Sequence, residues 1–256
     1  MKSHRFNLLV LLSVLTLALA ACSPSSTSTS PRVIDPSRPL SQQVSVSPLH
    51  FEESGEAPKY KITADVPTII GVDDPRVKAF NDLTYGDYQL FVGELKDALQ
   101  SMPTEPISGG STLDVRYELV SPPGEIISLK YLITGYADGE PQPFHNIRTI
   151  NFNIETGQIV QLDSLFLTGS NYLQTLSTYC AAELASRKIG FEAFASGADP
   201  SPENYQHWNI TADGLMITFD EYQVADYSAG QQAVTVPYSA LKDLIDPQGP
   251  LGKYVK

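Results

Sequence analysis

The sequence predicts an α+β fold in which antiparallel sheets carry amphipathic helices on one face, arranged as two small subdomains. Apolar and polar residues alternate in several stretches that are bounded by Gly, Pro or Asp, which is typical of half-buried strands. Two other stretches repeat apolar residues every three or four positions, which is typical of helices. The order is strands, helix, strands, helix, strands, without regular βαβ units, and this order favours antiparallel sheets.

The N-terminus has the pattern of a lipoprotein signal peptide. Lys2 and Arg5 precede an apolar run, residues 6–21, that ends with small residues before Cys22. The run is shorter than the ~20 residues of a membrane span. We therefore expect cleavage after residue 21, palmitate-type acylation of Cys22, and a lipid anchor on the extracytoplasmic face of a cell membrane. An ordinary signal peptide that is cut nearby is the alternative.

Residues 22–43 are rich in Ser, Thr and Pro, and this composition predicts a flexible tether. The rest divides into an N-terminal α+β subdomain at 44–110 and a C-terminal α+β domain at 111–256.

The chain is acidic. Its net charge is −12, and removal of a signal containing Lys2 and Arg5 changes this to −14. Such a charge disfavours nucleic acid as a partner and favours a cationic protein. Solubility alone is the other explanation of the acidity.

The first subdomain should contain strands at 44–52 and 59–66, followed by a long helix. Asp73-Asp74-Pro75 is a helix start, with an Asp cap and Pro in the first turn. An apolar stripe then continues to Leu99, although two glycines, at 86 and 93, predict a weak middle. The two aspartates could pass for a metal pair, but capping explains them without an ion.

The second domain should begin with strands at 113–119 and 126–136 and a hairpin formed by 146–155 and 158–162. A short helix at 163–167 and a long one at 171–188 follow, with Cys180 buried on the apolar stripe of the latter. The strand-rich stretch 208–241 completes the fold.

Motifs in this last stretch resemble a known domain family. They are Asp213-Gly214-Leu215, the spaced residues from Phe219 to Gly230, and Val236-Pro237-Tyr238. The family forms the extracytoplasmic part of a lysozyme-sensing anti-sigma factor and the non-catalytic N-terminal part of peptidoglycan polysaccharide deacetylases. The resemblance covers about residues 45–241 and implies contact with peptidoglycan or with a cationic wall-acting protein such as lysozyme. Where the family has a Gly-Ala-His element, this chain has Gln142-Pro143-Phe144 before His145, so the loop that presents the histidine differs.

No catalytic constellation, cofactor motif or metal-ligand spacing is readable from the sequence. The histidines are isolated, whereas zinc requires three or four ligands. Asn151, Asn153 and Glu155 share a strand face and could bind Ca²⁺, but a polar outer face opposite Ile150, Phe152 and Ile154 is the favoured explanation. Asp220 and Glu221 are adjacent in a predicted strand and should diverge.

Four residues are candidates for ligand contact. Tyr205, His207 and Trp208 lie in one predicted loop, where exposed aromatic faces could stack on sugars or anchor a partner. His145 is added from the resemblance. Tyr222 and Tyr238 are instead expected in the core.

These features together predict a lipid-anchored, non-catalytic binding module of the bacterial envelope. The alternatives are a cell-wall glycan hydrolase or deacetylase whose site converges only in three dimensions, and a structural envelope lipoprotein.

Overall fold

The computed structural model describes residues 32–254. The predicted signal peptide and Cys22 lie outside these residues. Nine strands form two sheets of six and three strands, with helices on both, and this confirms the α+β class. No helix in the described part of the chain combines the length and the apolar character that a bilayer crossing demands.

The larger sheet has the strand order β1-β2-β3-β4-β5-β6. Its strands are β1 (Val46–Glu56), β2 (Lys59–Ile69), β3 (Ser111–Leu119), β4 (Ile126–Tyr136), β5 (Phe144–Asn153) and β6 (Gln158–Ile159). All neighbours are antiparallel except β2 and β3. These two pair in parallel because the chain crosses between them through helix α1 (Pro75–Leu99), so the expectation of a fold without βαβ units is wrong at this point.

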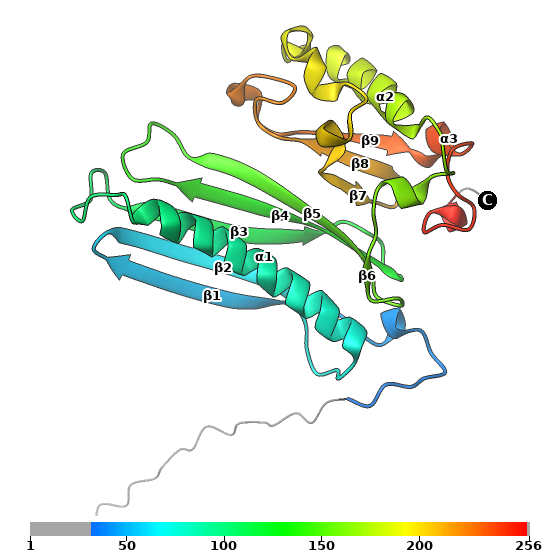
Figure 1. Ribbon diagram of the computed structural model, residues 1–256, viewed down its shortest axis with the longest axis horizontal. Helices are drawn as coiled ribbons and strands as arrows, with labels where there is room; N and C mark the ends of the chain where they lie inside the picture. Colours follow the sequence, from blue (N-terminus) through cyan, green and yellow to red (C-terminus); the bar gives the residue numbers. More distant parts are fainter. Residues whose placement is uncertain (1–31, 255–256) are drawn as a thin grey trace, which may run out of the picture. The chain divides into compact units, whose positions relative to one another are not determined.

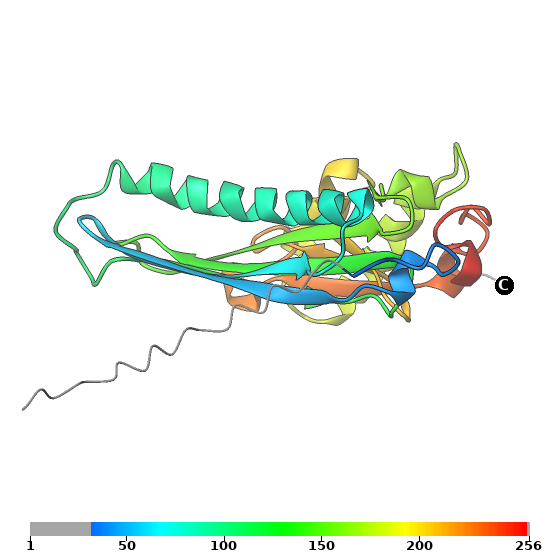
Figure 2. The ribbon, with the colours of Figure 1, turned by 90° about the horizontal axis from the view of Figure 1, so that it is seen from below.

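Helix α1 begins and runs as the sequence predicts. The Asp74 carboxylate accepts a hydrogen bond from the Arg76 backbone N–H at 2.8 Å, with Pro75 in the first turn. The helix lies along one face of the six-stranded sheet (Figure 2), and its apolar stripe packs against that face. Gly86 and Gly93 do not interrupt the helix, and both lie where an added side chain would meet open space.

The smaller sheet is a meander at the C-terminal end of the chain (Figure 1). Its strands are β7 (Trp208–Ile210), β8 (Gly214–Phe219) and β9 (Gln232–Pro237), with α2 (Tyr172–Ser186) packed against β9 and α3 (Tyr238–Leu241) following it. Strand β7 contacts β4 and β5. This contact is on the face of the larger sheet opposite α1. Ser128 of β4 bonds Asn209 of β7, whereas the next residue, Leu129, points to the other face and packs in the cluster under α1.

A buried hydrogen-bond network joins the two sheets. The Asn151 Nδ2 donates to the Trp208 carbonyl at 2.9 Å, and its Oδ1 accepts from Ser128 Oγ at 2.6 Å. Asn209 Nδ2 donates to the same Ser128 Oγ at 2.9 Å and to the Leu129 carbonyl at 2.9 Å. Asn151, Ser128 and Asn209 are all buried, so Asn151 is not on a wet outer face as predicted: the second sheet covers it.

The core is divided between the two sheets. One cluster fills the space between α1 and the six-stranded sheet, and the other surrounds the three-stranded sheet and α2. The division falls near residue 155, whereas the boundary expected at residue 110 lies within one continuous sheet, since β2 pairs with β3. Cys180 is fully buried in the second cluster as predicted, and this burial raises the pKa of its thiol to about 12.

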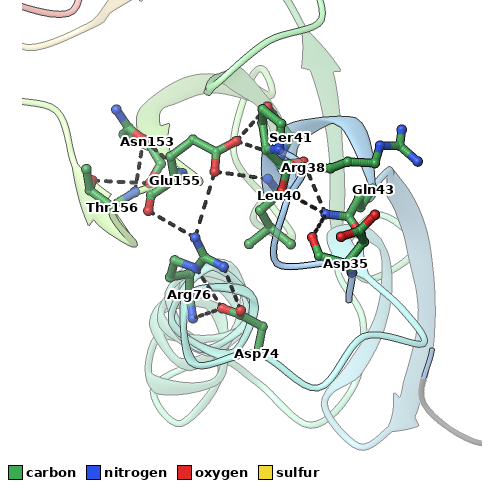
Figure 3. Close-up of polar contacts among 11 residues, drawn as sticks. Asp35, Arg38, Leu40, Ser41, Gln43, Asp74, Arg76, Asn153, Glu155 and Thr156 are labelled. Carbon is green, nitrogen blue, oxygen red and sulfur yellow. Dashed lines mark hydrogen bonds and ion pairs between the residues drawn. The ribbon is translucent and has the colours of Figure 1, made fainter. Parts of the chain in front are cut away.

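The segment before β1 packs against the body, and here the expected tether is corrected for the described residues. Leu40 is buried, and Leu40–Gln42 form a short 3-10 turn. The Glu155 carboxylate accepts from the backbone N–H groups of Leu40 and Ser41 at 3.0 and 2.8 Å, and from the Ser41 hydroxyl at 2.7 Å (Figure 3). Glu155 therefore serves this turn and is not part of a calcium-binding strand face. Arg76 bonds Asp74 at 2.7 Å and the Glu155 carbonyl at 3.2 Å, which links the turn to the start of α1.

Candidate functional site

Two of the four predicted contact residues are buried. Tyr205 is 1% exposed and Trp208 is 6% exposed, and the Tyr205 hydroxyl donates to the Ala198 carbonyl inside the protein at 2.7 Å. Their expected exposure is wrong, because Trp208 lies in β7, which contacts the larger sheet, and Tyr205 packs in the hydrophobic cluster around the smaller sheet. Tyr238 is buried as predicted.

His145 lies at the start of β5 and meets the connection between β8 and β9. Its Nδ1 is 2.8 Å from Glu221 Oε1, and the Glu221 side chain is only 13% exposed. The Gln231 side chain donates to the His145 carbonyl at 3.0 Å, which fixes the backbone of the histidine. The fold thus brings together groups that are 76 positions apart in the sequence.

Two tyrosines extend this site to the surface. Tyr222, predicted to be core, is 56% exposed, and its ring centroid is 5.7 Å from that of Tyr227. The Tyr227 ring is in turn 6.4 Å from the His145 imidazole. Tyr222 has a φ of 65°, a left-handed conformation that is uncommon for a bulky residue and concentrates at functional sites.

The Tyr227 hydroxyl donates to the Pro143 carbonyl at 2.9 Å and so ties the two loops together. Burial and the nearby negative charge of Glu221 raise the pKa of Tyr227 above its ordinary value. On the other loop, the Gln142 side chain reaches the Tyr222 hydroxyl at 3.4 Å. We call His145, Glu221, Tyr222, Tyr227 and Gln142 the loop site.

A hollow of about 380 Å³ adjoins the loop site. It is lined by Leu132, Ile133, Thr134, His145, Asn146, Glu221 and Gln231. Amide, hydroxyl and carboxylate groups on this wall can hydrogen-bond the hydroxyls of a sugar, and the exposed tyrosine faces can stack on its ring.

His207 belongs to a second hollow. Its Nε2 is 3.2 Å from Asp220 Oδ2, and both residues line a groove of about 400 Å³ between α1 and β5. Asp220 and Glu221 pair with different histidines in different hollows, so they diverge as predicted, but they follow the end of β8 and do not lie in a strand as expected. Within the described residues, no group of three or more His, Cys, Asp or Glu side chains is placed to hold a metal ion.

Sequence reasoning found His145 but missed Glu221, Tyr222, Tyr227 and Gln142. One available signal was the polar run Asp220-Glu221, which marks the end of β8 at Phe219. The pairing with His145 itself depends on how the second sheet docks, and no local pattern reports that.

The same part of the chain matches a known family. Residues 163–239 match DUF3298. The family is described as a protein of unknown function, and the matched range holds α2, the three-stranded sheet and the Glu221, Tyr222 and Tyr227 part of the loop site. This confirms the predicted resemblance to an envelope domain family.

Two curated relatives are similar over most of the chain. One is the peptidoglycan-N-acetylmuramic acid deacetylase PdaC of Bacillus subtilis, which is 27% identical over 164 residues, 62% of this chain and 33% of its own length. The chain therefore spans about a third of that relative. The other is the esterase Rv3036c of Mycobacterium tuberculosis, 27% identical over 199 residues, 76% of this chain and 82% of its own length.

Solved structures of DUF3298 proteins share the fold. A member from Bacteroides fragilis has a TM-score of 0.63 at 12% identity and covers 83% of this chain and 97% of its own. A member from Pseudomonas aeruginosa has a TM-score of 0.59 at 15% identity and covers 80% of this chain and 95% of its own. At these identities the likeness concerns the fold alone.

Proposed function

We propose that this chain is a lipid-anchored, extracytoplasmic module of the bacterial envelope that binds the glycan of peptidoglycan at the loop site. The observation that carries the proposal is the pair formed by the exposed Tyr222 and the half-buried Tyr227, which lies beside the largely buried carboxylate of Glu221 and the amide of Gln142. Aromatic faces next to hydrogen-bonding groups suit sugar rings, which present apolar C–H faces and hydroxyl edges.

The relationship to PdaC supports this ligand, because that relative is named for its action on peptidoglycan. It also supports an extracytoplasmic location. The apolar run before Cys22 supports anchoring by lipid.

A pelleting experiment with purified peptidoglycan sacculi tests the proposal. The full-length chain in mild detergent should sediment with sacculi, and Tyr222→Ala and Tyr227→Ala should each weaken retention about tenfold, the loss of roughly one stacking contact. Tyr85→Ala is the matched control, because Tyr85 is 43% exposed but lies on α1. Retention that is equal for all four proteins would refute the site, and no retention of the wild-type chain would refute the ligand.

The acidity of the chain favours a second candidate, a cationic wall-acting protein such as lysozyme. Contact of this kind is dominated by charge and should weaken strongly as salt is raised through 0.15 M, where the screening length is about 8 Å. Sugar stacking should change little over the same range. Binding to lysozyme that disappears with salt, together with no retention by sacculi, would replace the first candidate with the second.

Anchoring is tested separately by cell fractionation. Cys22→Ala should move the protein from the membrane fraction to the soluble fraction, because the acyl chains supply the hydrophobic attachment. Ser23→Ala is the control, and membrane retention of the Cys22 variant would contradict the lipid anchor.

A further inference from the structure

Three histidine–carboxylate pairs occur among the described residues, and one of them differs from the others in its setting. His50 and Asp65 are 2.9 Å apart on an open strand surface, with side chains 63% and 42% exposed. His207 uses Nε2 to meet Asp220. His145 instead meets Glu221 through Nδ1, leaves Nε2 without a hydrogen-bond partner, and lines a hollow of about 380 Å³.

We infer that His145 and Glu221 form a general-base dyad that hydrolyses carboxylic esters in this hollow. The inference goes beyond glycan binding, although both use His145 and Glu221. The geometry supplies the usual requirement of such a base: a carboxylate 2.8 Å from Nδ1 favours the tautomer with its proton on Nδ1, which leaves Nε2 as the proton acceptor.

The surroundings hold this arrangement in place. The Glu221 side chain is 13% exposed and the His145 side chain is 39% exposed, so the carboxylate is largely enclosed while the imidazole remains open to the hollow. The Gln231 bond fixes the His145 backbone, and the left-handed Tyr222 directly follows Glu221. Strain next to a functional group persists only where the surrounding structure enforces it.

Thr134 completes the site. It is the cross-strand partner of His145 in the β4–β5 register, so the two side chains project from the same face as direct neighbours. Thr134 also lines the hollow and is exposed. Its hydroxyl can donate to the oxygen of an ester carbonyl as that oxygen becomes negative.

The reaction is balanced without a further reagent. A water oxygen attacks the acyl carbon while its proton passes to His145 Nε2, which gives a tetrahedral intermediate and an imidazolium paired with Glu221. The carbon–oxygen bond to the alcohol then breaks, and the leaving oxygen takes the proton from Nε2. The products are a carboxylic acid and an alcohol. An ester fits this site better than an amide, because an alcohol oxygen leaves with one transferred proton more readily than an amine nitrogen does.

Hydrolysis of p-nitrophenyl acetate by the full-length chain tests the inference. His145→Gln and Glu221→Gln should each lower kcat/KM about 10²-fold, with the Glu221 effect mainly in kcat, since Glu221 positions the base and does not touch the substrate. Glu221→Asp should retain part of the rate. His50→Gln is the matched control, because it removes a histidine from an equally short acid pair that lines no hollow, and its rate should equal wild type.

A spectroscopic measurement separates positioning from a merely structural role. The ¹⁵N shifts of His145 should report the Nδ1–H tautomer in the wild-type chain, and Glu221→Gln should shift the population toward the other tautomer. Thermal unfolding identifies a variant that fails to fold. If Glu221→Gln does not fold, the rate of Glu221→Asp and the ¹⁵N shifts of His145 in the wild-type chain test the positioning role instead.

A wild-type rate no greater than that of free imidazole, or an undiminished rate in His145→Gln, would overturn the dyad. A chain that binds sacculi but hydrolyses no ester refutes this inference and leaves the proposed function standing. A chain that hydrolyses esters in a His145-dependent manner but does not bind sacculi supports the dyad and refutes the proposed function.

Discussion

At the scale of single residues, the role of the Glu155 carboxylate follows from its hydrogen bonds and not from its position in the sequence. It follows the end of β5 and accepts three hydrogen bonds from Leu40 and Ser41, which are more than a hundred positions earlier in the chain. Burial opposes its ionisation, but these hydrogen bonds and the charge of Arg76 outweigh burial and lower the pKa of Glu155. The Glu155 carboxylate therefore holds the Leu40–Gln42 turn against the body of the protein.

Glu155→Gln should destabilise the protein by about 1–3 kcal/mol, because a glutamine amide turns an N–H₂ group toward backbone donors that then lose an acceptor. Urea unfolding measures the loss. Glu56→Gln, an exposed glutamate at the end of β1, is the control and should change stability by less than about 0.5 kcal/mol. Equal stability of the two variants would show that the hydrogen bonds from Leu40 and Ser41 to Glu155 do not stabilise the protein.

The same pKa shift predicts a dependence on pH. Because the folded-state pKa of Glu155 is lower than its unfolded value, its contribution is complete above the ordinary glutamate pKa of 4.5 and is lost as pH falls through the folded-state pKa. The stability difference between wild type and Glu155→Gln should therefore be largest near neutral pH and shrink in acid. A difference that is constant from pH 7 to pH 3 would contradict this assignment.

Asp138 is a second carboxylate whose pKa is lowered by hydrogen bonds from a loop, here the loop that precedes β3. Its carboxylate accepts from the backbone N–H groups of Ile107 and Ser108 at 2.6 and 2.9 Å, and from the Ser108 hydroxyl at 2.7 Å. The Ser108 hydroxyl, followed by these backbone donors, lowers the pKa of Asp138 to about 2. The loop before β3 should stay ordered at pH 3 and loosen only as pH falls through about 2, and amide exchange at Ile107 and Ser108 would detect earlier loosening.

At the scale of elements, α1 shows how packing overrides a weak local sequence. Gly86 and Gly93 lower the helix propensity of its middle, yet the helix is continuous because one stripe of apolar side chains is buried along its whole length. Both glycines lie on the outer side, where an added methyl group would touch nothing.

Gly86→Ala and Gly93→Ala should each stabilise the protein by about 0.5–1 kcal/mol, because alanine loses less conformational entropy in a helix. Thermal unfolding measures the gain. Gly214→Ala is the contrasting variant, since its Cβ would collide with the Val236 carbonyl oxygen of the neighbouring strand, and it should destabilise. A destabilising effect of either helical substitution would show that the glycine serves a purpose beyond the helix.

At the scale of the whole described body, two hydrophobic clusters are joined by a polar seam. Asn151 and Asn209 both hydrogen-bond Ser128, and Asn151 also donates to the Trp208 carbonyl of β7, so the sheets meet through directional bonds. Among the described residues, the buried Asn209 Oδ1 has no hydrogen-bond partner. Such a joint fixes one register between the sheets, and this register is what places Glu221 against His145.

Asn151→Ala should therefore lower stability by about 1–3 kcal/mol by leaving buried partners unpaired, and should loosen the three-stranded sheet first. Trp208 is the only tryptophan and lies in β7, so its fluorescence reports that sheet. In the variant, the fluorescence transition should precede loss of far-UV circular dichroism. Asn171→Ala, an exposed residue before α2, is the control, and coincident transitions in both variants would contradict a weakened joint.

The sequence by itself determined the α+β class, the positions of most strands, the capped start of α1 and the buried stripe around Cys180. These follow from periodicity and capping, which act over a few neighbouring residues. It also indicated His145, through a resemblance.

Only the tertiary structure decided what lies on the outer face of β5. Alternation shows that Asn151 points away from the core that holds Ile150 and Phe152, but it does not show that a second sheet covers Asn151. Burial and partner choice depend on contacts between segments far apart in the chain, and for this reason Tyr205 and Trp208 turned inward while Tyr222, Tyr227 and Glu221 gathered around His145.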